Sequence, residues 1–265
     1  MHVNHKTLLY IYCVTCEDPS LQSHAGCDEL FFLEINGLYA AVKYVSEDDY
    51  SEVNIKKRLS DESWLDANVR EHLNVIGLIM QVNTVIPFNF GTVYKSEEGL
   101  KSFICKYAND FKTGLRYLEN KEEWSVKAFC NKQKIIENIV LLSQNIADIE
   151  VQIRESSPGK AYILKKKKAD ILGKEINNIY NTLSKHVFTR INELPDEYRL
   201  HAISQEKVSE SDGDMIINAT FLLRKENLGN FIKTTDSLLV EHEDIGLSLE
   251  VTGPWPPYSF VNLSK

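Results

Sequence analysis

The sequence lacks the short motifs that mark most catalytic sites. It has no phosphate-binding loop, no dinucleotide-binding glycine turn, no zinc-protease helix and no nucleophile elbow. His186, His201 and His242 are scattered among polar neighbours, as surface histidines commonly are. Because no acid/base pair or nucleophile constellation emerges, we expect a protein that is not an enzyme and that binds no cofactor.

The sequence also lacks long apolar runs and a net positive charge, and it contains few cysteines. No apolar run reaches the ~18 residues of a membrane-spanning helix, and the first residues do not follow the pattern of a secretory signal. The net charge of −8 disfavours a nucleic-acid partner, because phosphate binding requires a basic surface. Five cysteines among 265 residues do not suggest a disulfide framework. We therefore expect a cytoplasmic protein with neither nucleic acid nor a lipid membrane as partner.

Four residues of metal-ligand type lie near one another in the first part of the chain: Cys13, Cys16, His24 and Cys27. Their spacing, C-x2-C-x7-H-x2-C, admits a Cys3His zinc site, although it departs from common zinc-finger spacings. Cys13 also falls in a predicted core strand, where residues three apart point to opposite faces. Buried small thiols are the favoured interpretation, and a zinc site is the alternative.

The first half, residues 1–120, has the pattern of an α+β domain. Residues 8–15 form an apolar, β-branched run typical of a buried strand. Asn36 and Gly37 separate two further apolar runs and favour a type I′ hairpin turn. Helical spacing follows in residues 61–82, then a strand whose Pro87 indicates an edge or a bulge, and then a helix capped by Ser96.

The second half, residues 121–265, predicts the order β-α-β-β-α-β. Its helical insertion, about residues 131–194, carries two apolar stripes. The first stripe is spaced 4-3-4-3-4 from Ile135 to Ile153, and Pro158 restarts the helix before the second. Two stripes joined by a short break predict an antiparallel helical hairpin. The element order is that of a ferredoxin-like fold with an extended first helix.

The tail, residues 252–265, combines prolines with aromatic side chains. In a ferredoxin-like domain the last strand lies at a sheet edge, where prolines are tolerated. One interpretation is that the tail docks on the protein's own surface; the other is that its P-x-x-P pattern contacts a partner. The residues that would make a partner contact are Trp255, Pro256, Pro257, Tyr258 and Phe260.

Several stretches, in this order, resemble the gas vesicle protein L/F family (GvpL/GvpF). The most specific are "PFNFGT" (87–92) and "GPWPPYSFV" (253–261), and the others include "GLYAAVKYVS", "KEEWSVKAFC", "GKAYILKKKK" and "INATFLLRKE". The resemblance covers nearly the whole chain. One departure is Phe88-Asn89, which stand where the commoner family form has an apolar-basic pair.

The resemblance implies a non-enzymatic accessory or minor structural protein that acts in gas vesicle assembly or nucleation. Such a protein would lie in the cytoplasm with the vesicles and would bind the main shell protein and other accessory proteins. The implied fold is two α+β domains, the second a modified ferredoxin-like domain. The alternative function is a ferredoxin-like small-molecule-sensing or metal-binding regulatory module, for which fold-level analogy is the warrant.

Overall fold

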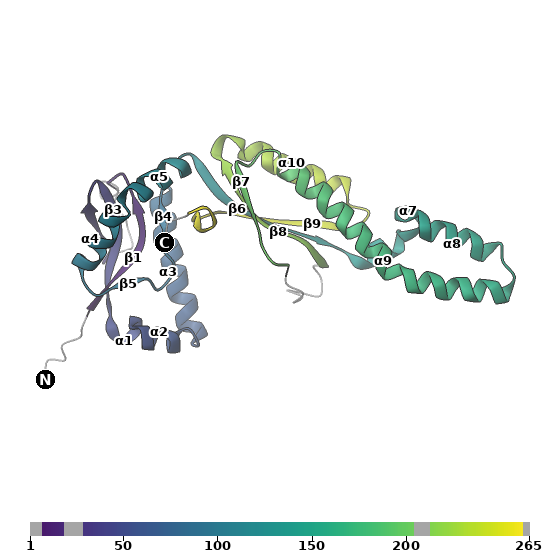
Figure 1. Cartoon of the computed structure of the whole chain (residues 1–265), viewed down its shortest axis with the longest axis horizontal. Coiled ribbons are helices and arrows are strands. Elements are labelled where there is room, and N and C mark those ends of the chain that lie inside the picture. Colours follow the sequence, from purple (N-terminus) through teal and green to yellow (C-terminus); the bar gives the residue numbers. More distant parts are fainter. Residues whose placement is uncertain (1–6, 19–28, 204–212, 262–265) are drawn as a thin grey trace. The chain divides into compact units, whose positions relative to one another are not determined.

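A computed structural model describes residues 7–18, 29–203 and 213–261. The chain is a mixed α+β protein with two sheets and many helices (Figure 1). It divides into two compact units, one of Met1–Glu123 with Pro254–Lys265 and one of Trp124–Gly253. Residues 254–261, which the element order assigns to the second domain, therefore pack with the first unit. The contacts that hold these residues there are non-local, and no local pattern encodes them.

The first unit contains a five-stranded sheet of order β2-β3-β1-β4, in which β5 also pairs with β1. All of these pairs are antiparallel. Asn36 and Gly37 both have positive φ, which confirms the predicted hairpin turn. Pro87 lies on the edge strand β4, where its missing N–H costs little. The strands are β1 Thr7–Thr15, β2 Phe31–Ile35, β3 Leu38–Ser46, β4 Ile86–Pro87 and β5 Val93–Tyr94.

Five helices of the first unit are α1 Glu47–Tyr50, α2 Glu52–Arg58, α3 Glu62–Met80, α4 Glu97–Lys106 and α5 Ala108–Leu118. Ser96 caps α4 as predicted, since its side chain accepts from the Gly99 N–H at 3.2 Å. The helix expected to follow Ser96 is divided into α4 and α5 at Tyr107. The apolar face of α3 packs on Tyr10 and Tyr12 of β1.

The second unit contains a four-stranded sheet of order β7-β8-β6-β9, so that β7 and β9 are its edges. β7 and β8 are antiparallel. In β6, Val126, Ala128 and Cys130 face the core, and in β9 Leu247 does. The strands are β6 Lys121–Cys130, β7 Glu197–Leu200, β8 Asp214–Arg224 and β9 Leu247–Trp255.

The insertion between β6 and β7 is a helical hairpin, in which α8 lies along α9 (Figure 1). Its first arm is divided where the sequence predicts one helix. Asn138 and Ser143 interrupt it, and the Ser143 side chain caps α8 by accepting from the Ile146 N–H. The helices are α6 Lys132–Glu137, α7 Ile139–Leu142, α8 Gln144–Arg154 and α9 Pro158–Ile191.

The core of the second unit joins its sheet to α9 and to α10 (Leu228–Glu241). Leu183 and Val187 of α9 and Phe231 and Leu238 of α10 are buried in one cluster with Phe221 of β8. Over the described residues, no helix has both the length and the apolar character needed to cross a membrane.

Candidate functional site

The segment from Pro254 to Val261 is held against the first unit. Pro256, Pro257 and Phe260 are buried, and Tyr258–Phe260 form one turn of 3-10 helix. Trp255 is 41% exposed. The apolar part of the segment is therefore packed on the protein's own surface, while the indole at its start remains accessible.

Ser259 fixes this segment to a buried carboxylate. Its backbone N–H donates to Glu123 Oε2 and its hydroxyl donates to Glu123 Oε1, both at 2.9 Å. Glu123, at the start of β6, is only 5% exposed. Burial raises the pKa of the Glu123 carboxyl, and the two bonds from Ser259 act against that rise. Because both oxygens have a donor, the carboxylate is satisfied by the segment that covers it.

Tyr258 meets a buried histidine on α3. Its hydroxyl oxygen lies 2.9 Å from His72 Nε2, which also lies 3.1 Å from the Phe88 carbonyl oxygen. The other ring nitrogen, Nδ1, lies 2.8 Å from the Tyr10 hydroxyl. A carbonyl oxygen only accepts, so the network assigns the proton to Nε2 and leaves Nδ1 to accept from Tyr10.

Burial keeps His72 uncharged. Desolvation lowers the pKa of its imidazole from 6.5 to about 4, and the bond to Phe88 offsets part of that effect. The surrounding hydroxyls are also neutral at physiological pH, because burial raises the pKa of Tyr10 and of Tyr258 and raises that of Tyr50 to about 12. The network thus supplies fixed hydrogen bonds rather than groups that exchange protons near neutral pH.

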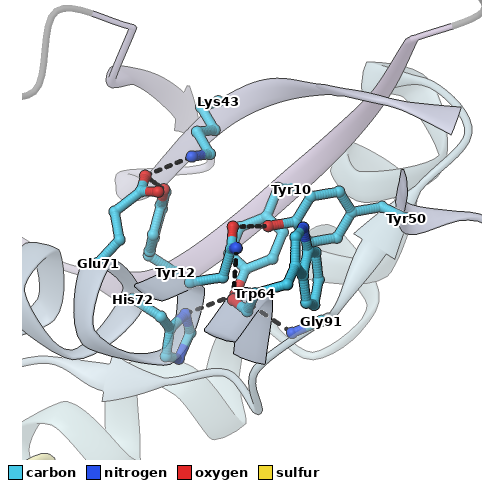
Figure 2. A network of polar contacts seen from close by, with 9 residues as sticks. Tyr10, Tyr12, Lys43, Tyr50, Trp64, Glu71, His72 and Gly91 are labelled. Carbon is cyan, nitrogen blue, oxygen red and sulfur yellow. Dashed lines mark hydrogen bonds and ion pairs between the residues drawn. The ribbon is translucent and has the colours of Figure 1, made fainter. Parts of the chain in front are cut away.

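Aromatic rings surround this network (Figure 2). Tyr12 stacks on His72 with ring centroids 5.6 Å apart, and Tyr50 meets Tyr10 edge to face at 5.3 Å. At the rim, the Tyr12 hydroxyl donates to Glu71 at 2.9 Å, and Lys43 forms an ion pair with the same carboxylate. Phe90 packs edge to face on both Tyr10 and His72. We name Tyr10, Tyr12, Tyr50, His72 and Phe90 the aromatic cradle.

The helical hairpin carries the other candidate surface. Ile146 and Ile149 of α8, and Ile176, Leu183 and Val187 of α9, are buried, so both stripes pack inward. The end of the hairpin that carries residues 155–157 nevertheless exposes apolar side chains. The exposed fractions are 44% for Val151, 73% for Tyr162 and 67% for Ile163.

Comparison with known proteins identifies the family. The family model described as gas vesicle synthesis protein GvpL/GvpF matches residues 8–262. The chain belongs to the GvpL/GvpF family. The resemblance stated from the sequence is thereby confirmed.

Individual relatives and solved structures agree with this membership. Gas vesicle protein L of Streptomyces sp. (strain CB03234) is 24% identical, covering 97% of this chain and 94% of that protein. Gas vesicle protein L1 of Halobacterium salinarum is 21% identical, covering 95% of this chain and 89% of that protein. The crystal structure of GvpF from Anabaena sp. PCC7120 has a TM-score of 0.69 at 20% identity, covering 98% of this chain and all of that one. The crystal structure of GvpF from Microcystis aeruginosa has a TM-score of 0.64 at 17% identity, covering 97% of this chain and 99% of that one.

The two stretches that carry the family resemblance most specifically meet in this GvpL/GvpF protein. Phe88, from residues 87–92, and Tyr258, from residues 253–261, contact the same His72 nitrogen. Gly91, from the first stretch, has φ of 82° and donates its N–H to the Tyr10 hydroxyl at 3.2 Å. Both stretches stand out in the sequence, but His72 and Tyr10 do not: His72 lies between Glu71 and Leu73 in a mixed helical pattern, and Tyr10 lies in an apolar strand run.

The four residues of the zinc alternative are not all within the described part of the chain. Cys13 is fully buried in β1 and desolvation raises the pKa of its thiol, whereas Cys16 is exposed. A buried thiol with a raised pKa is a poor metal ligand, because the thiolate is the form that binds. His24 and Cys27 lie outside the described residues, so a zinc site there stays a prediction.

Proposed function

We propose that this GvpL/GvpF protein is a non-enzymatic accessory factor that binds the main shell protein during gas vesicle assembly. Family membership supports the gas vesicle role, and the exposed apolar end of the hairpin supports the binding. A shell built from a small, strongly apolar subunit requires such a factor, because exposed apolar surface aggregates before it orders. The protein would work in the cytoplasm beside other accessory proteins of the vesicle.

Tyr162 and Ile163 are the residues that carry the proposal. Both lie in the first two turns of α9 and are more than half exposed, while Leu164 beside them is buried and anchors the helix. Helices that offer apolar side chains to solvent in this way dock against a second helix or in a groove. An amphipathic segment of the shell subunit is the occupant that this surface suits.

The second unit supports the proposal as a rigid base for the hairpin. Its elements follow the order β6, helices, β7, β8, α10, β9, and its sheet has the order β7-β8-β6-β9. We propose that this unit is a modified ferredoxin-like domain with the hairpin inserted after its first strand. The core that ties α9 to the sheet would then hold the free end of the hairpin at a fixed distance from it.

A capture experiment tests the docking surface. The tagged full chain is mixed with the shell protein, and capture is compared between the parent and a double variant, Tyr162→Glu with Ile163→Glu. Val240→Glu is the matched control, because Val240 is also apolar, helical and 76% exposed. We expect the double variant to lose capture and the control to keep it.

A further variant, Trp255→Ala, tests the C-terminal edge as the docking surface instead. Capture that survives the hairpin double variant and is lost in Trp255→Ala would refute the hairpin proposal. Capture unaffected by either variant would refute both surfaces. Circular dichroism of each variant confirms that the fold is kept, so that a loss of capture reports on the surface itself.

A further inference from the structure

Two histidines and a glutamate converge at the end of α10. His186 comes from α9, Glu241 is the last residue of α10, and His242 follows it as the C-cap. His186 Nε2 lies 3.1 Å from Glu241 Oε1, and His242 Nε2 lies 3.6 Å from the same oxygen. No sequence motif indicates this cluster, because the two histidines are far apart along the chain.

His242 has an unsatisfied ring nitrogen. Its Nε2 is buried and has no hydrogen-bond partner among the described residues. The 3.6 Å to Glu241 exceeds hydrogen-bond length. A buried polar atom without a partner is costly, and in native proteins it calls for an explanation such as an ion or a water. An ion placed between the three side chains would accept the lone pair of this nitrogen.

The distances in the cluster suit a tetrahedral ion. With metal–ligand bonds of about 2.1 Å, two ligand atoms of a tetrahedral zinc site lie about 3.4 Å apart. The two distances to Glu241 Oε1, 3.1 and 3.6 Å, bracket this value. The ligand atoms of all three residues lie within 4.8 Å of one another. A small rotation of one imidazole ring would bring the two histidine nitrogens to the separation that a tetrahedral ion requires.

The neighbouring charge leaves one carboxylate oxygen available. Arg190 Nη1 lies 3.4 Å from Glu241 Oε2, on the oxygen that does not face the imidazoles. The guanidinium therefore orients the carboxylate and turns Oε1 toward His186 and His242. Contacts of this kind, which orient a ligand from outside, are typical of metal sites.

An open cleft of about 490 Å³ adjoins the cluster. His186, Glu241 and His242 form part of its wall, and Ile179, Leu183 and Ile245 make much of the rest apolar. Glu175, also on the wall, is already bound by Ser143 at 2.6 Å and by Asn145 at 3.0 Å. The cleft leaves room for a water or a ligand atom at a fourth position, the arrangement of an open zinc site.

We propose that His186, Glu241 and His242 bind one divalent transition-metal ion, with the cleft supplying its fourth position. Two imidazoles and one carboxylate are a ligand set that suits Zn²⁺. By joining α9 to the end of α10, the ion would fasten the two helices that pack on the second sheet. The site is separate from the cysteines of the first unit.

Zinc titration of the metal-free full chain tests the proposal. Calorimetry should give one site per chain, and Zn²⁺ should raise the midpoint of thermal unfolding. His242→Ala should weaken zinc binding by more than about 100-fold, since loss of even an orienting contact costs 10- to 100-fold, and should abolish the thermal shift. His242 donates no hydrogen bond from Nε2, so this variant removes a ligand without removing a bond of the fold.

Two further variants separate a metal site from a hydrogen-bond cluster. Glu241→Gln retains an acceptor for His186 but weakens the metal site. It should lose the zinc-dependent shift and change the metal-free midpoint only slightly, because the Arg190 ion pair that it weakens is partly exposed. His201→Ala is the control, because His201 bonds to Thr220 and is not part of the cluster. It should bind zinc as the parent does.

Cobalt distinguishes this site from the cysteine cluster. Co²⁺ held by imidazole and carboxylate absorbs in the visible region without the strong thiolate-to-cobalt band of a cysteine site. Zinc binding that is unchanged in His242→Ala, or a cobalt spectrum with a thiolate band, would overturn the proposal. Absence of zinc binding by the parent would overturn it as well.

Discussion

Acidification should destabilise the first unit through His72. The imidazole is neutral and buried in the folded state, with a pKa lowered from 6.5 to about 4, whereas the unfolded chain restores the ordinary value. Between these two values the unfolded state binds more protons, so the free energy of unfolding falls as the pH falls. From pH 7 to pH 4.5 this difference in pKa removes about 2.5 kcal/mol.

The loss has a structural reason at ring nitrogen Nδ1 of His72. In the protonated ring, Nδ1 becomes a donor and faces the Tyr10 hydroxyl, which already accepts from the Gly91 N–H. The Tyr10 hydroxyl would have to turn its own proton away, and the cation would stay in an aromatic cradle with little water. Tyr258, bonded to the same imidazole, should lose its anchor together with the fold around it.

The assay is denaturant unfolding over a pH series, with His72→Gln as the control. Glutamine can donate to the Phe88 carbonyl but does not titrate, so the difference in pH slope between parent and variant isolates the histidine. Subtracting the slope of the variant is needed because Glu123 also titrates. Its pKa is raised in the folded state, so its contribution to the free energy of unfolding falls as the pH rises, whereas that of His72 falls as the pH falls. A parent slope equal to that of His72→Gln would refute the reasoning.

Three other predictions concern the docked segment and two glycines. Ser259→Ala keeps the backbone hydrogen bond to Glu123 but removes the hydroxyl bond, and it should lower the free energy of unfolding in urea by about 2 kcal/mol. The loss should be smaller in a Glu123→Gln background, and an equal loss in both backgrounds would contradict a hydrogen bond to a charged carboxylate. Gly213 has φ of 78°, and an added Cβ would lie 2.2 Å from the Cys130 carbonyl oxygen, so Gly213→Ala should lower the free energy of unfolding by about 2 kcal/mol or more, measured in the same urea unfolding assay. Gly173→Ala on α9 meets no atom within 4 Å and should stabilise by up to about 1 kcal/mol; destabilisation there, or tolerance at Gly213, would contradict the geometry.

Local chemistry made the elements of this fold predictable. Asn36 and Gly37 accept positive φ, Ser96 has the side chain of an N-cap, and residues 8–15 form the apolar, β-branched run that becomes β1. Each signal is complete within a few residues. Apolar periodicity predicts one helix across each of the breaks at Tyr107 and Asn138, because the apolar period continues through both positions.

The sites depend on contacts that local chemistry does not encode. Tyr258 and His72 are 186 residues apart in the chain, and the local sequence around either residue does not predict their contact. His186 and His242 likewise meet because α9 and α10 pack on one sheet. The family resemblance reached the right stretches of sequence, yet it did not indicate that residues 87–92 and 253–261 share a histidine.

The return of residues 254–261 to the first unit has a consequence during synthesis. The aromatic cradle and Glu123 are made early, but Tyr258 and Ser259 follow only after Trp124–Gly253. At roughly 5–20 residues per second, that stretch delays them by on the order of ten seconds. For this interval the nascent first unit holds an uncovered carboxylate and an uncapped imidazole. The first unit, although translated first, therefore cannot complete its contacts until the end of the chain has been made.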